Sequence, residues 1–188
     1  MSFTLLGILN SQAAGGGGGP AYDLLETQVL ASSASSVTFT GLGAYSDYKH
    51  LQIRAVTQID KTTDTIENVF CKLNGATSGY SWHYLNGNGS SVVSSGNGAA
   101  TFILLRNATI NQTNSGYSAG FVTDILDFSS TSKNTTTRTL SGSVAGTEQE
   151  IVLSSGSYNN TSAVTSIELY QPSYNFNIGS RFSLIGVK

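Results

Sequence analysis

The chain has 188 residues, which fits one domain or one domain with an arm, and only 11% of its residues are charged. The formal net charge is −2 and no run of lysine or arginine occurs, which argues against binding of nucleic acid. The single cysteine, Cys71, excludes an internal disulfide.

The N-terminal segment begins with the apolar run "SFTLLGIL" and continues into five glycines, Gly15 to Gly19, and then Pro20. The run is too short to cross a membrane, and no lysine or arginine precedes Lys49, as a secretory signal would require. We therefore expect no membrane segment and a retained anchor arm over residues 1–20, in which the glycines form a tether. The alternative is that this segment is a plain first strand of the body's own sheet. The residues expected to contact a partner are the apolar ones of the arm: Phe3, Leu5, Leu6, Ile8 and Leu9.

Beyond the arm, five stretches alternate apolar and polar residues with a period of two, which predicts half-buried strands. In chain order they are "SSVTFT", "HLQIRAV", "NVFCKL", "TSIELY" and "RFSLIGV". Cys71 lies in the third stretch, and we expect a buried structural thiol there. Two further stretches, "TFILL" and "FVTDILDF", are apolar on both faces, which predicts cover from both sides by another sheet or another subunit.

Clusters of Asn, Gly and Ser separate these stretches and favour tight hairpins. No apolar pattern with a helical period lasts for three turns, and the two prolines, Pro20 and Pro172, fall where a strand is absent or ends. About ten short strands at close spacing predict an all-β fold, an antiparallel β-sandwich or jelly roll, over residues 21–188.

The most aromatic segment of the chain is "GYSWHYLNGNG", residues 79–89. Its aromatic rings could stack on a sugar ring while its amides bond the sugar hydroxyls. The alternative is a strand edge with a core tryptophan. The residues proposed for a glycan or subunit contact are Tyr80, Trp82, His83, Tyr84 and Asn86.

The sequence offers little for catalysis. Asp124 and Asp127 are spaced so that they point to opposite faces of a strand, which does not suit a glycosidase pair. The G-x-S-x-G elbow of serine hydrolases is absent. "DKTTD", residues 60–64, lacks the glycine and distal glutamate of a calcium loop. We therefore expect a protein that is not an enzyme and has no metal or other cofactor.

Taken together, the segments "LNGATSGYSWHYLNGNG", residues 73–89, and "FSLIGVK", residues 182–188, resemble a family of virion proteins of tailed bacteriophages. The resemblance covers about residues 24–188 and leaves the arm outside. It implies a capsid decoration (cement) protein on the virion surface, docked through its arm on the major capsid protein or another virion protein. The alternative that it leaves open is a tail or neck fibre or spike module that binds host glycans.

The resemblance also favours a homotrimer, since closed symmetry is usual for oligomers and the two doubly apolar stretches need cover. The residues expected near a shared threefold axis are Phe102, Leu104, Phe121 and Leu126. A carbohydrate-binding or hydrolytic domain unrelated to virions is a third possibility, but it would need a ligand or catalytic cluster that the sequence does not contain.

Overall fold

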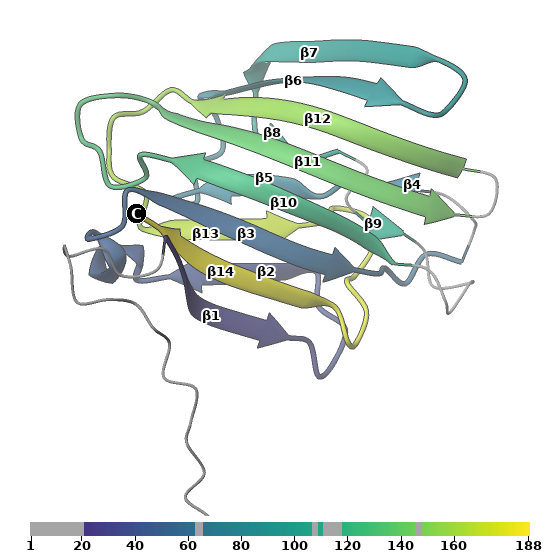
Figure 1. The fold of residues 1–188 in the computed structure, drawn as a ribbon, viewed down its shortest axis with the longest axis horizontal. Coiled ribbons are helices and arrows are strands. Elements are labelled where there is room, and N and C mark those ends of the chain that lie inside the picture. The colour runs from purple at the N-terminus through teal and green to yellow at the C-terminus, as the bar shows by residue number, and fades with distance from the viewer. Residues whose placement is uncertain (1–20, 63–65, 107–108, 111–117, 146–147) are drawn as a thin grey trace, which may run out of the picture.

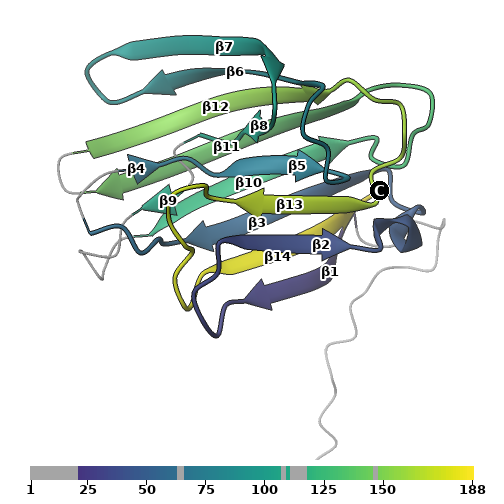
Figure 2. The same ribbon diagram turned by 180° about the vertical axis from the view of Figure 1, so that it is seen from behind.

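The protein is a sandwich of two antiparallel β-sheets (Figures 1 and 2), so the predicted sandwich is confirmed. The computed structural model describes residues 21–62, 66–106, 109–110, 118–145 and 148–188. The expected arm, including Phe3, Leu5, Leu6, Ile8 and Leu9, lies outside the described residues.

The large sheet has eight strands in the order β1-β14-β3-β10-β11-β12-β6-β7, and every neighbouring pair is antiparallel. Figure 1 views this sheet from the face that the second sheet leaves uncovered. Its strands are β1 (Tyr22–Val29), β3 (His50–Thr57), β6 (Tyr80–Gly87), β7 (Val92–Ala100), β10 (Ala119–Leu126), β11 (Thr135–Ala145), β12 (Glu148–Tyr158) and β14 (Arg181–Val187).

The small sheet has four strands in the order β2-β13-β5-β8 and covers the opposite face of the large one (Figure 2). The β6–β7 hairpin lies at the far edge of the large sheet, and Val92 to Ala99 on β7 are exposed. The remaining elements are β2 (Ser36–Thr40), β5 (Phe70–Leu73), β8 (Ile103–Leu104), β13 (Ser166–Tyr170), the pair β4 (Ile66–Glu67) and β9 (Thr109–Ile110), and a short 3-10 helix, Leu42–Tyr45.

The core lies between the two sheets, where Phe39 and Ile167 of the small sheet pack with Ile53 and Leu184 of the large one at no exposure. Cys71 is also buried, as predicted, and burial raises the pKa of its thiol to about 12. The thiol is therefore a packing group rather than a reactive one.

The five alternating stretches form β2, β3, β5, β13 and β14, as predicted. Other strands escaped prediction because their residues are typical of turns. β7 contains "SSGNG", which we expected to be a turn, and β11 is built largely from Thr, Ser and Gly. Pairing with neighbouring strands overrides the weak local preference of such residues.

Two of the residues expected at a threefold axis are instead buried inside a single chain. Phe121 of β10 is 3% exposed and belongs to the core between the sheets, whereas Leu104 of β8 is 5% exposed, pairs with Phe70 and lies outside that core. A single chain therefore already covers both side chains, which leaves little of either surface for a contact between copies. Phe102 and Leu126 are half-buried, and the Phe102 ring packs on Phe70 with centroids 4.4 Å apart.

Candidate functional site

Strand β11 of the large sheet has an inverted polarity, and its neighbour β12 shares it at Leu153 and Ser154. On β11 the side facing the small sheet carries buried Thr and Ser, whereas Leu140 and Val144 on the outer side are 49% and 46% exposed. On β12 the outer residues Ile151 and Leu153 are 61% and 57% exposed. A sheet with one solvated face normally turns its apolar residues to the core. The buried residues of the β11 alternation are Thr135, Thr137, Thr139, Ser141 and Ser143.

Hydrogen bonds satisfy part of this polar interior, whereas the buried hydroxyls of Thr137 and Ser143 have no partner among the described residues. The hydroxyls of Thr123 and Thr139 lie 2.9 Å apart, and the Ser141 hydroxyl donates to the carbonyl of Arg106 at 2.7 Å. Buried polar groups are inexpensive only when they are paired in this way. The fold therefore accommodates small polar residues inward, and this placement leaves the aliphatic residues on the outer face.

These aliphatic residues are neighbours across the strands. Val122 pairs with Leu140, Leu140 with Leu153, and Leu153 with Leu85, so one row of aliphatic side chains crosses four strands. Residues directly opposite on one face of a sheet are in contact range. We name this surface the outer patch, and its members are Val56, Leu85, Val122, Leu140, Ile151 and Leu153.

Charged groups border the outer patch on one side. Arg138 forms an ion pair with Asp124 at 3.1 Å, and the side-chain amide of Gln52 donates to the same carboxylate at 2.7 Å. Arg54 follows Val122 in the aliphatic row and lies over the ring of Tyr22, 5.6 Å from its centroid. A contiguous apolar surface with a polar border is the usual composition of an interaction site.

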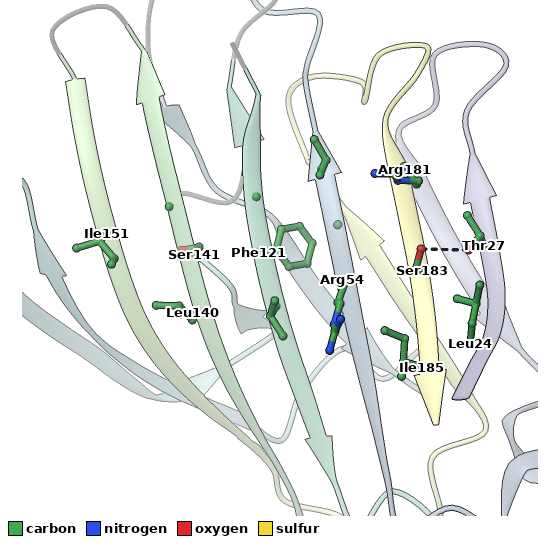
Figure 3. Close-up of a pocket in the computed structure, with 15 residues that line it drawn as sticks. Leu24, Thr27, Arg54, Phe121, Leu140, Ser141, Ile151, Arg181, Ser183 and Ile185 are labelled. Atoms are coloured by element: carbon green, nitrogen blue, oxygen red, sulfur yellow. Dashed lines mark hydrogen bonds between the residues drawn. The ribbon is translucent and has the colours of Figure 1, made fainter. Parts of the chain in front are cut away.

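The outer face is also hollowed. A hollow of about 750 Å³ extends from β1 to β12, and Leu24, Arg54, Leu140 and Ile151 are among its lining residues (Figure 3). A second hollow of about 570 Å³ shares Gly142 and Ile151 with the first. A third, of about 780 Å³, lies over the charged border beside His83. The outer face is therefore shaped to receive another surface or segment.

The five residues of β6 proposed for a glycan or subunit contact divide between the two faces of the strand. Tyr80, Trp82, Tyr84 and Asn86 share the inner face, whereas His83 lies on the outer face with Leu85. Tyr80 and Asn86 are 1% and 4% exposed, so neither can meet a ligand from solvent.

The more accessible rings of β6 are engaged within the chain. Trp82 and Tyr84 stack with centroids 6.0 Å apart, and the guanidinium of Arg106 lies 4.1 Å from the Tyr84 centroid. These contacts fit the alternative of a core tryptophan near a strand edge better than a sugar platform.

The acidic residues singled out from the sequence are also engaged in structural contacts. Asp127 pairs with Lys133, and that hydrogen bond holds the pKa of its carboxyl below the ordinary value. Its backbone amide donates to Nδ1 of His50 at 2.8 Å. Among the described residues, no group of three or more His, Cys, Asp or Glu side chains is placed to hold a metal ion. Nor does the described part contain a helix with the length and apolar character to cross a bilayer.

Sequence reasoning missed most of the outer patch, although a signal for it exists. "TLSGSV" and "IVLSS" alternate large and small residues, which indicates strands. Alternation does not tell which face is buried, and the usual assumption places the large residues inside.

Comparison of the chain with protein-family models, with curated proteins and with solved structures found no match. The function is therefore argued from the surface of the sandwich itself.

Proposed function

We propose that this protein is a structural subunit of a larger assembly, in which the outer patch is covered by another surface. The observation that carries the proposal is the inverted polarity of β11 and β12. Thr139 and Ser141 occupy the interior while Leu140 and Leu153 stand half-exposed outside. Burying a half-exposed aliphatic side chain contributes about 1 kcal/mol, so the six residues of the outer patch supply about 5 kcal/mol for association.

The resemblance to virion proteins suggests which assembly this is: a bacteriophage particle on which the protein serves as a capsid decoration protein. Three features of the chain suit that role. The chain has few charges to repel neighbouring copies. The buried hydroxyls of Thr139 and Ser141 on β11 are hydrogen-bonded within the chain itself. The acidic residues singled out from the sequence are engaged in structural contacts.

The first experiment compares Leu140→Asp/Leu153→Asp with Thr136→Asp in the full-length chain. All three positions are exposed on the outer side of β11 or β12, but Thr136 lies outside the outer patch. Multi-angle light scattering over a concentration series should show association for the wild type and for Thr136→Asp, and monomers for the double variant. Circular dichroism should be the same for all three. Association by the double variant at wild-type strength would refute the role of the outer patch.

The second experiment tests the virion itself. Quantitative mass spectrometry of particles purified from cells that carry the gene in its native genome should find the protein in many copies per particle. Its absence from those particles would refute the decoration role but would leave the light-scattering result unaffected.

A further inference from the structure

Three glycines lie in a row across the outer face, next to the aliphatic row of the outer patch. Gly120 of β10 pairs with Gly142 of β11, Gly142 pairs with Ile151 of β12, and Ile151 pairs with Gly87 of β6. We call this row, together with the two hollows that meet at Gly142 and Ile151, the furrow.

The fold does not explain these glycines. A Cβ at Gly87, Gly120 or Gly142 would have its nearest neighbour at 3.7 to 4.0 Å, which is ordinary contact, and none of the three has a positive φ. Gly156 differs, because a Cβ there would lie 2.5 Å from Ile103. Glycine in a strand interior costs about 0.5–1 kcal/mol relative to alanine and often marks the close approach of another backbone.

The walls of the furrow indicate what it receives. Leu140 and Val56 line the first hollow and Val144 lines the second, while Arg54 and Arg181 add charged groups to the first and Glu150 adds one to the second. Within the furrow, the row from Val56 of β3, which pairs with Gly120, to Gly87 of β6 crosses four strand spacings, or about 19 Å. An extended segment of six or seven residues spans about 20–23 Å. The occupant that fits is therefore a short, extended, apolar and uncharged segment.

This chain contains such a segment outside the described part. Residues 3–9, "FTLLGIL", are apolar except for Thr4, and residues 1–20 contain no Asp, Glu, Lys or Arg. The described chain then enters the large sheet at β1, whose Leu24 lines the first hollow. We propose that the furrow binds the segment Phe3–Leu9 of a second copy of this chain, so that copies are joined by exchange of their arms. This inference rests on the proposed function and names the partner of the outer face.

The length of the tether allows the segment to reach the furrow of a second copy. The twelve residues from Asn10 to Ala21 span up to about 40 Å when extended. Within one sheet, β1 and β3 are only two spacings apart, about 10 Å. A glycine-rich tether four times longer than this internal distance suits a connection between separate bodies.

The experiment uses three full-length variants. Leu5→Asp places a charge in the arm, Gly142→Val fills the furrow, and Gly98→Val is the matched control. Gly98 lies on β7, where a Cβ meets nothing within 4 Å. Light scattering should show that Leu5→Asp and Gly142→Val each lose association and that Gly98→Val retains it. Leu5→Asp should unfold at the wild-type denaturant midpoint, and the two glycine variants should unfold at or above it, which separates docking from folding.

Mixing tests whether the arm docks on another copy. Leu5→Asp keeps an intact furrow and Gly142→Val keeps an intact arm, so an equimolar mixture should recover association that neither variant shows alone. A labelled peptide of residues 2–10 should bind Leu5→Asp in a fluorescence anisotropy titration. It should not bind Leu5→Asp/Gly142→Val, and it should bind Leu5→Asp/Gly98→Val.

Each other outcome overturns the inference. If the peptide binds but neither the wild type nor the mixture associates, the arm occupies its own furrow. If the peptide does not bind Leu5→Asp, the furrow has a different occupant. If Leu140→Asp/Leu153→Asp abolishes association while Leu5→Asp does not, the proposed function stands and arm exchange is wrong.

Discussion

Tyr80 joins the two sheets through a single hydroxyl group, and removal of this hydroxyl should lower the stability of the protein. The side chain starts on β6 of the large sheet and is 1% exposed. Its hydroxyl accepts a hydrogen bond from the Leu73 amide at 2.9 Å and donates one to the Leu73 carbonyl at 3.0 Å, on β5 of the small sheet. Burial raises the pKa of Tyr80 above its ordinary value, so the hydroxyl is protonated at neutral pH and makes both bonds.

The variant Tyr80→Phe removes both bonds with little change in shape. It leaves the Leu73 amide buried without this partner, which costs about 1–3 kcal/mol, and it loses a second bond worth about 1 kcal/mol. We expect the free energy of unfolding to fall by about 2–4 kcal/mol. For a chain of this length, each 1 kcal/mol lowers Tm by about 2–4 °C, so Tm should fall by about 4–16 °C.

Tyr158→Phe is the matched control. The Tyr158 ring stacks on the Tyr80 ring with centroids 4.9 Å apart, and no described residue hydrogen-bonds its hydroxyl. Its loss should change the free energy of unfolding by less than about 0.5 kcal/mol. Urea denaturation followed by tryptophan fluorescence measures both variants. Equal destabilisation by the two substitutions would show that the hydroxyl bonds of Tyr80 do not tie the sheets together.

Three further predictions concern single side chains. Cys71 should resist alkylation at pH 8 in the native protein and react fully in denaturant, because burial raises its pKa to about 12; rapid native labelling would contradict the packing role. Gly186→Ala should destabilise the sandwich by about 1–3 kcal/mol in urea denaturation, since its Cβ would lie 2.5 Å from the Tyr48 ring, and unchanged stability would show that this ring moves freely. The Asp127 carboxyl should titrate below its ordinary value in an NMR pH series, and Lys133→Met should raise its pKa; the stabilisation is present above the ordinary pKa and is lost as the pH falls through the lowered one.

The sequence predicted the fold class because alternation of apolar and polar residues indicates a strand, whatever the position of that strand in the sheets. "HLQIRAV" and "RFSLIGV" became β3 and β14, and Cys71 became a core residue within β5. The strand β7 was not predicted, because Gly96 and Gly98 resemble turn residues. Its ladder with β6 is a contact that local sequence does not contain.

For the candidate site, too, the sequence predicted one part and the tertiary structure decided the other. Sequence alone predicted a β-sandwich preceded by an arm without charged residues, but it made no use of the alternation of large and small residues in β12. It placed Leu104 and Phe121 at an interface, whereas the structure buries both in one chain. It also grouped His83 with Tyr84 on a single surface, although neighbouring residues of a strand face opposite ways. Only the tertiary structure decided which phase of the alternation faces outward, because burial depends on what the second sheet covers and not on the strand itself.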